Sequence, residues 1–234
     1  MLDTNLLYKK KSAIPNDFVF GMDFENGFTD TSAHGWPVTN TGVTLASTPV
    51  LSGAQNAVFS KTVVTPATTY LRTDTSAWGV NPFVDDWTIE YYFYNLTQGN
   101  FGQSVFFTLG NHNALGYALY VTGRYQKLGL FWSNGQNDIH NSITADPATF
   151  NLNTKYHAAI VKKGKVFTIY KNGAQVSTAT LDTSAWTLNS SILTIGCISE
   201  TANGSTTEFP WIGNLDNFRY YNYARYSSNF TPDP

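Results

Sequence analysis

Cysteine, charged side chains and long apolar runs are all scarce in this chain of 234 residues, and each scarcity excludes a class of protein. The single cysteine, Cys197, cannot form a disulfide within the chain, so a disulfide-stapled fold is excluded. It lies in the apolar run 192–197, where we expect a buried and unreactive thiol. Charged residues make up only 13% of the chain and the formal net charge is −2, which offers no basic surface to nucleic acid.

Nowhere does the chain contain 18 consecutive apolar residues, so we expect no membrane insertion. Near the N-terminus a basic cluster, 9–11, follows a short apolar patch, which is the reverse order to a secretory signal peptide. We therefore expect a chain that is made in the host cytoplasm without a signal peptide. Such a chain reaches the outside of a cell by lysis or on a particle.

Aromatic residues are abundant, at 15% of the chain, and the stretch WTIEYYFY at 87–94 arranges them with a period of two. This spacing predicts a strand with two different faces. One face is apolar, and we expect it to be buried between two sheets; it carries Trp87, Ile89, Tyr91 and Phe93. The other is expected to be wet and to carry one carboxylate and two phenols; it consists of Thr88, Glu90, Tyr92 and Tyr94.

Short β-like segments recur along the rest of the chain, separated by Gly, Pro, Ser and Thr, and no helical period is convincing. This spacing predicts an antiparallel sandwich or barrel. The clearest local signal is 156–180, where Lys163-Gly164 and Asn172-Gly173 separate three alternating segments and predict a three-strand meander. Further strands are expected at 18–24, 38–45, 57–60, 70–72, 104–109, 117–122, 128–132, 192–197 and 215–221.

Two other features bear on organisation. The pentapeptide DTSAW occurs at 74–78 and again at 182–186. In each copy we expect Asp and Thr to bond nearby backbone and Trp to dock on the sandwich edge, with a paired binding feature as the alternative.

Residues 1–16 mix apolar and basic side chains, and we expect either an arm that docks on a neighbouring protein or a loosely packed terminus. Residues 17–234 are then one domain.

Several segments, in order, resemble those of concanavalin A-like lectin/glucanase domains of the laminin-G-like type. They are FGMDFENGFTDTSAHG, DDWTIEYYFYN, KYHAAIVKKGKVFTIYKNGAQV, ILTIG and WIGNLDNFRYYNYARYSSNFTPDP. The resemblance covers roughly 18–234 and implies an all-β, two-sheet antiparallel jelly-roll sandwich, with ligands on its concave face or in rim loops. The ending ARYSSNFTP is similar to a form frequent in such domains of bacteriophage structural proteins. The same fold hosts glycosidases, lectins and structural modules, so it does not imply catalysis.

Glycoside hydrolysis normally needs two carboxyl groups about 5 to 10 Å apart. The glucanases that this chain resembles carry a Glu-x-Asp run on a concave strand, and the chain has no such run. Glu90 has only Thr88 and Tyr92 as same-face neighbours, and no Ser-His-Asp set, phosphate loop or His/Cys metal spacing offers another chemistry. We therefore expect a protein that is not an enzyme, with a polysaccharide hydrolase as the weakest alternative.

Sugar binding needs less: an aromatic plane and a few fixed polar groups. The expected ligand-binding residues are Glu90, Tyr92 and Tyr94 on the strand, with His112, Asn113 and Trp132 in neighbouring loops. The alternative is that these tyrosines only cover the sheet or contact another subunit. His157 alternates with core positions, and we expect it to be a hydrogen-bonded structural residue.

In many proteins of the resembling family a structural calcium ion joins the first strand or loop to an acid of the last strand. The matching positions are Asp23 or Glu25 and Asp216, and carboxylate oxygens are the ligands that calcium prefers. The alternative is that Asp216 pairs with an arginine or caps a turn.

Together these observations favour a non-enzymatic surface module of a phage-type virion, on a tail, fibre or capsid, that binds host-surface carbohydrate. Its residues 1–16 would contact other virion proteins. The alternative is a purely structural or decoration protein that mediates particle assembly. The sequence leaves open the glycan and whether the chain is a homo-oligomer.

Overall fold

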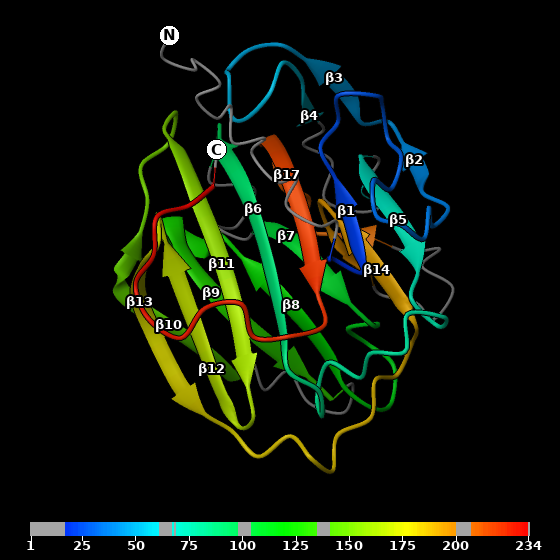
Figure 1. Ribbon diagram of the computed structural model, residues 1–234, viewed down its shortest axis with the longest axis vertical. Coiled ribbons are helices and arrows are strands. Elements are labelled where there is room, and N and C mark those ends of the chain that lie inside the picture. The colour runs from blue at the N-terminus through cyan, green and yellow to red at the C-terminus, as the bar shows by residue number, and fades with distance from the viewer. Residues whose placement is uncertain are drawn as a thin grey trace, which may run out of the picture.

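The structure, a computed structural model, describes residues 17–60, 67, 69–97, 104–134, 141–199 and 207–233. The expected N-terminal docking segment, 1–16, lies outside the described residues. The described part is almost entirely β-strand, and its two main antiparallel sheets pack face to face as a sandwich (Figure 1). The predicted fold class is therefore confirmed. The helical structure in this part is a 3₁₀ turn, η2, at Arg124–Gln126, and no helix there is long and apolar enough to cross a membrane.

The front sheet in Figure 1 has eight strands, and β6, the strand predicted from the alternating stretch 87–94, lies near its middle. Its main path runs β13 (Ala174–Thr180), β12 (Val166–Lys171), β11 (Lys155–Lys163), β6 (Trp87–Asn95), β17 (Gly213–Tyr221), β4 (Asn56–Phe59) and β3 (Thr44–Ala46), and β1 (Phe20–Met22) pairs with β17. The predicted meander is confirmed as β11, β12 and β13. Asn172 and Gly173 form the turn between β12 and β13, both with positive φ.

The back sheet has seven strands and contains all the remaining long pairings. Its order is β10 (Asn141–Thr149), β9 (Lys127–Ser133), β8 (Ala118–Thr122), β7 (Val105–Leu109), β14 (Ile192–Ile195), β5 (Tyr70–Asp74) and β2 (Thr39–Thr41). A short pair, β15 (Ile198–Ser199) and β16 (Thr207–Glu208), is separate from both sheets. The sequence did not predict β10, because it has no clear alternation and contains Pro147, which is tolerated at a sheet edge.

The core between the sheets is aromatic. The apolar face predicted for 87–94 is confirmed, because Trp87, Ile89, Tyr91 and Phe93 are all fully buried and belong to one large cluster. Phe93 meets Phe106 of β7 edge to face, with ring centroids 4.9 Å apart, so the two sheets interlock through quadrupole-favoured contacts. Cys197 is buried and forms no disulfide within the described residues, as predicted.

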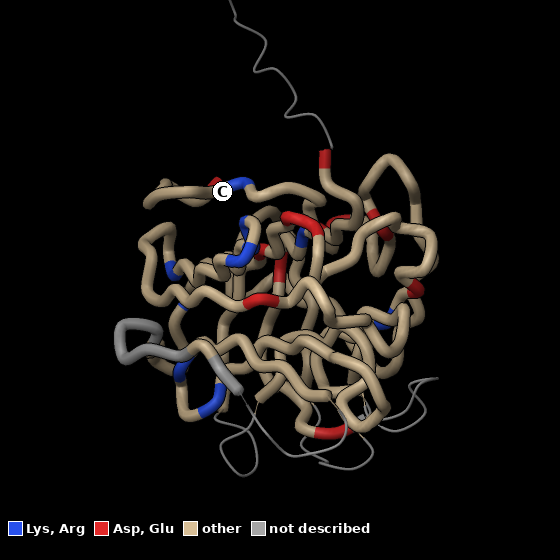
Figure 2. Tube along the Cα trace, turned by 90° about the horizontal axis from the view of Figure 1, so that it is seen from below, with Lys and Arg blue, Asp and Glu red and all other residues tan. Residues whose placement is uncertain are grey.

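Charges contribute little to this architecture. Figure 2 shows Lys, Arg, Asp and Glu scattered thinly along the trace, with both signs interspersed. The few charges that are buried among the described residues are therefore informative: they are Glu90, Lys162 and Asp216, and Glu90 lies on the outer face of the front sheet.

Candidate ligand-binding site

The outer face of β6 carries Glu90, the carboxylate that the sequence singled out. Glu90 is only 4% exposed, and both of its oxygens accept hydrogen bonds. Tyr221 donates to Oε1 over 2.9 Å and Tyr226 donates to Oε2 over 2.6 Å. The guanidinium of Arg225 donates to Oε1, and Nε2 of His157 lies 3.4 Å from Oε2. Glu90 is thus a satisfied member of a buried polar cluster.

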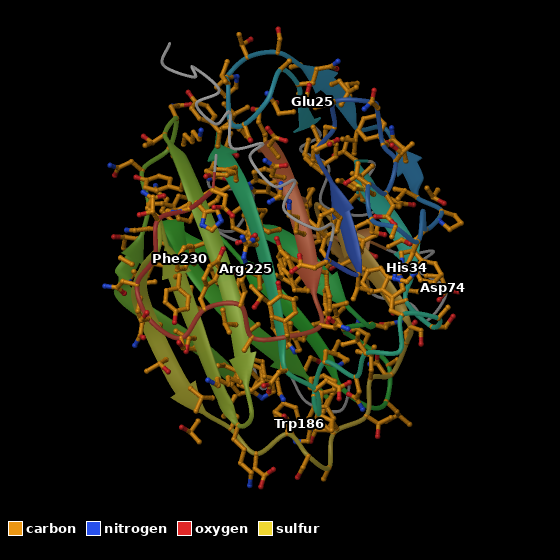
Figure 3. The ribbon with its side chains drawn as sticks, viewed as in Figure 1. Glu25, His34, Asp74, Trp186, Arg225 and Phe230 are labelled. Atoms are coloured by element: carbon orange, nitrogen blue, oxygen red, sulfur yellow. The ribbon has the colours of Figure 1, made fainter. Side chains whose placement is uncertain are left out.

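The C-terminal segment, residues 222–233, supplies Arg225 and Tyr226 to this cluster. In Figure 1 it runs in red from the end of β17 across the front of β6, β11 and β12. Backbone contacts fix it at separate points: Thr88 Oγ1 donates to the Tyr223 carbonyl over 3.0 Å, and Phe230 N donates to the Gly173 carbonyl over 2.9 Å. Figure 3 shows Arg225 and Phe230 lying over this face. The segment therefore covers the surface that the sequence predicted to be wet.

The charges in the cluster stabilise one another. Burial raises the pKa of Glu90, but the hydrogen bond from His157 and the charge of Arg225 outweigh it and lower the pKa to about 2. Arg225 also donates to Asp233 near the chain end, so one guanidinium joins two carboxylates. The expectation that His157 is structural is confirmed by its burial and its contact with Glu90.

The prediction of an open Glu90, Tyr92 and Tyr94 surface needs correction. Tyr92 is 8% exposed and its hydroxyl donates to the Asp233 carbonyl, so Glu90 and Tyr92 are both covered. Tyr94, farther along the strand, is partly exposed. The physical reason is that two phenols and a carboxylate form a surface to which an aromatic and cationic segment of the same chain can bind. The ligand-binding role of these three residues stays a prediction, without an open face to support it.

The loop residues expected beside this strand lie elsewhere. His112 and Asn113 follow β7 in the back sheet, where His112 Nδ1 lies 2.9 Å from Asn113 Oδ1. Trp132, on β9, is 8% exposed and points into the core, with its ring 5.8 Å from that of Trp186. These residues are in the other sheet, because the chain crosses the sandwich after β6. They do not extend the Glu90 surface.

His112 does line a small pocket on the outer side of the back sheet, together with Tyr120, Phe131 and Arg124. Its volume is about 20 Å³, which is enough for about one water molecule and too little for a sugar ring. The aromatic rings of Tyr120 and Phe131 stack on each other there, with centroids 5.5 Å apart. Among the described residues this pocket is therefore a packed cluster.

The three carboxylates predicted to bind calcium are close enough to interact. Burial raises the pKa of Asp216 to about 7, and the nearby charges of Glu25 and Asp23 raise it further, against the backbone N–H groups of Asn217 and Ser52 that lower it. Ser52 N donates to Asp216 over 2.8 Å, and Ala54 N donates to Glu25 over 2.7 Å. Within the described ranges, no three acidic, His or Cys side chains form a ligand group for a metal. Calcium binding at these positions stays a prediction.

An open cleft lies at one end of the sandwich, between the loop 75–85 and the segment 187–191. Its volume is about 360 Å³. Its polar lining consists of Thr75, Ser76, Asn81, Asp85, Thr187 and Ser191, and its apolar lining includes Val80, Pro82 and Leu188. A few hydroxyl, amide and carboxylate groups around an aliphatic floor are typical of a site for a small polar ligand.

The first copy of the repeated pentapeptide lines this cleft through Thr75 and Ser76, and the second copy ends one residue before the lining residue Thr187. In each copy the Asp side chain accepts a hydrogen bond from the backbone N–H two residues on, over 2.7 Å for Asp74 and 3.2 Å for Asp182. Trp78 is buried in the main core, while Trp186 stacks on Tyr117 with a centroid distance of 4.2 Å. The expectation of local backbone bonding and a docked Trp is confirmed.

A second cleft, of about 290 Å³, adjoins the first. It is lined by Pro37, Thr39, Arg72, Thr73, Asp74 and Ile192. The boundary between the clefts is a backbone pairing, in which Thr75 N donates to the Ser191 carbonyl over 2.9 Å and Asp74 faces Ile192 in register. We call the two clefts together the edge groove. Figure 3 shows Asp74 at the far side of the molecule from Phe230, well away from the C-terminal segment.

Sequence reasoning missed the edge groove as a site. The repeated pentapeptide was the one signal that pointed toward it, because its first copy contributes Asp74, Thr75 and Ser76 to the lining. Arg72 carried no signal, since a single arginine in a short strand is indistinguishable from a surface charge. The C-terminal cover was also missed, although the aromatic character of the tail was visible.

Comparisons with known proteins agree with the geometry of the sandwich. A family model described as "Concanavalin A-like lectin/glucanases superfamily" matches residues 65–229. A search of curated protein sequences found no significant match.

Similar solved structures include the binding domain of Paraclostridial Mosquitocidal Protein 1, with a TM-score of 0.65, 15% identity, and coverage of 91% of this chain and 50% of the other. The botulinum neurotoxin serotype D ligand-binding domain in complex with N-acetylneuraminic acid has a TM-score of 0.64 and 9% identity, and covers 91% and 49%. The botulinum neurotoxin DC binding domain in complex with rat synaptotagmin II has a TM-score of 0.61 and 11% identity, and covers 91% and 49%. The chain thus spans about half the length of these domains, and identities this low show a shared fold.

Proposed function

The chain belongs to the concanavalin A-like lectin/glucanase superfamily, and on this premise we propose that it is a non-enzymatic carbohydrate-binding module whose ligand lies in the edge groove. One observation carries the proposal. Between the loop 75–85 and the segment 187–191 is a cleft of about 360 Å³ whose lining combines hydroxyl and amide groups with aliphatic side chains. This volume falls within the range of about 300–1,000 Å³ usual for small-ligand pockets.

A binding role is also supported by what the fold neighbours bind. One neurotoxin domain was solved with N-acetylneuraminic acid and another with rat synaptotagmin II. Catalysis has no such support, because hydrolysis of a glycoside needs two carboxyl groups around one bond. The oxygens of Glu90 instead accept bonds from Tyr221, Arg225 and Tyr226.

The test is a glycan array, together with pull-down on bacterial cell envelopes, for the wild-type chain and three Thr or Ser to Trp variants. Ser76→Trp and Thr187→Trp place a large ring at exposed positions of the cleft rim and are expected to reduce glycan binding at least tenfold. Thr180→Trp, at an exposed position on the edge strand β13, is the matched control and should bind as the wild type does.

Tyr92→Ala separates the two candidate surfaces. We expect it to destabilise the C-terminal segment without removing glycan binding, since Tyr92 is covered. If Tyr92→Ala loses glycan binding while Thr187→Trp binds as the wild type does, the edge groove is not the glycan site. The site would then lie on the outer face of β6. Absence of any glycan signal above background would contradict the carbohydrate-binding function itself.

The finer setting that we propose is the surface of a phage-type virion, with residues 1–16 contacting other virion proteins. It is motivated by the resemblance of the ending ARYSSNFTP to phage structural proteins. The test is co-sedimentation of the chain with particles from a lysate, with and without residues 1–16. Incorporation that survives the deletion would contradict the docking role of this segment, and absence of the protein from particles would contradict the setting.

For calcium we propose binding near Asp216, since a cation would relieve the repulsion that helps to raise the pKa of its carboxyl to about 7. The folded-state pKa lies above the ordinary 3.8, so without a cation stability decreases as the pH rises from about 4 to about 7. Excess calcium should therefore raise the melting temperature at pH 8 and have little effect at pH 5. A melting temperature unchanged by calcium and by EDTA at pH 8 would contradict the proposal.

A further inference from the structure

The second cleft of the edge groove is lined in part by the side chain of Arg72. Arg72 lies on β5, and its Nε donates to Thr194 Oγ1 over 3.3 Å. Its Cζ lies 4.6 Å from the ring centroid of Tyr70, two residues before it on the same face. These two contacts fix the plane and direction of the guanidinium before any ligand arrives.

One nitrogen of that guanidinium takes no part in these contacts. Its Nη2 is buried and has no hydrogen-bond partner in the described part of the chain, and no described carboxylate pairs with it. Arg72 also lines the open cleft and is partly exposed, so a ligand in the cleft can reach its side chain. A guanidinium matches a carboxylate best, because two parallel N–H groups can bond two oxygens at once.

The remaining lining determines which kind of carboxylate fits. Pro37 and Ile192 provide apolar contact, Thr39 offers a hydroxyl at an exposed position, and Asp74 offers a carboxylate. The pKa of Asp74 is lowered by the hydrogen bonds from Ser76, so its carboxylate is charged and can accept hydroxyl protons. A simple anion would be repelled by Asp74, whereas a sugar that carries both a carboxylate and hydroxyl groups would satisfy both side chains.

We infer that the Arg72 cleft is a subsite for a carboxylate-bearing sugar, of the uronic or sialic acid class, at one end of the glycan bound in the edge groove. This inference rests on the proposed carbohydrate-binding function and adds the acidic residue of the ligand to it. The cleft volume of about 290 Å³ is sufficient for one sugar ring. The carboxylate accepts from Arg72, and a hydroxyl of the same ring donates to Asp74.

The probes are D-glucuronate and N-acetylneuraminate as acidic sugars, D-glucose as the neutral sugar, and acetate as a carboxylate without a ring. Titrations followed by ¹H–¹⁵N NMR of the arginine Nε–H signals give a Kd for each probe. We expect at least one acidic sugar to bind about tenfold more tightly than glucose and acetate, with a saturable shift at Arg72. Tenfold corresponds to about 1.4 kcal/mol, the order of one charge-assisted hydrogen bond.

Three variants test the residues. Arg72→Gln should lower the affinity for the acidic sugar to that for glucose. Asp74→Asn can still accept a hydrogen bond from the Ser76 N–H, but it removes a negative charge. We therefore expect it to strengthen acidic sugar binding about two- to threefold. A purely structural role of Asp74 would not produce this increase in affinity. Arg124→Gln is the matched control, because Arg124 also has a buried partnerless atom, its Nε, and lines the small His112 pocket.

Equal affinities for acidic and neutral sugars in the wild type, with glycans still bound on the array, would overturn the subsite and leave the carbohydrate-binding function standing. Loss of acid preference in Arg124→Gln instead of Arg72→Gln would also overturn it. If Arg72→Gln does not fold, the sign of the Asp74→Asn effect decides: weaker acidic sugar binding contradicts the inference. Binding of no sugar by any method would overturn the function and the subsite together.

Discussion

Arg225 and Arg72 both lie on outer faces of the sandwich, but their surroundings are opposite. Arg225 donates to the carboxylates of Glu90 and Asp233 and to the hydroxyl of Tyr221, beneath a segment of its own chain. Arg72 has an open cleft beside it and a buried Nη2 without a described partner. The difference teaches that a charged, aromatic surface on this fold is not by itself a site. The surface richest in tyrosine is closed by the chain, and the groove with fewer aromatics is open.

The comparison predicts opposite energetic roles for the two arginines. Arg225→Gln would leave the buried Glu90 without its cation, and removing one partner of a buried pair costs about 3–5 kcal/mol. Arg72→Gln removes no ion pair among the described residues, so we expect a loss of less than about 1 kcal/mol. Urea unfolding of both variants measures the two free energies. Similar losses for the two would contradict the comparison.

The pH dependence of stability tests the charged cluster around Glu90, beneath the C-terminal segment. The pKa of Glu90 is lowered from 4.5 to about 2 in the folded chain, so its contribution is complete above about 4.5 and is lost as the pH falls toward 2. A shift of this size corresponds to about 3 kcal/mol. The free energy of unfolding, measured between pH 5 and pH 2, should therefore fall more steeply in the wild type than in Glu90→Gln. Parallel curves would show that the cluster does not hold the carboxylate charged.

Two glycine variants measure how tightly the C-terminal segment is held. Gly164 and Gly173 both have positive φ, so Ala at either position is strained by about 1 kcal/mol or more. A Cβ at Gly173 would lie 1.8 Å from the Phe230 carbonyl oxygen, whereas one at Gly164 would meet nothing within 4 Å. We expect Gly173→Ala to lose roughly 1–3 kcal/mol more than Gly164→Ala. Equal melting temperatures for the two variants would mean that the segment moves aside without cost.

Much of the fold could be predicted from local sequence patterns. The period of two at 87–94 identified the buried face of β6, and Asn172-Gly173 identified the meander, because both depend on residues that are adjacent in sequence. The buried Cys197 and the two Asp-headed turns followed from similarly local rules. β10 escaped because an edge strand with a proline lacks that local signature.

The candidate site could not be predicted from local sequence patterns in the same way. Arg225 is 135 residues from Glu90 in the sequence, and the pairing of Thr75 with Ser191 spans a similar distance, so no local pattern connects either pair. His112 and Trp132 were expected near Glu90 because their loops are near it in sequence. The crossover from β6 to β7 places them in the other sheet.

By itself, then, the sequence determined which side chains of each strand face the core, since hydrophobic burial acts on a local alternation that the chain spells out. It also determined the resemblance to the family to which the chain belongs. Only the tertiary structure decided which outer surface is closed and which is open. That choice depends on where a distant aromatic segment finds hydrogen-bond and ion-pair partners, and those partners meet only after both sheets have formed.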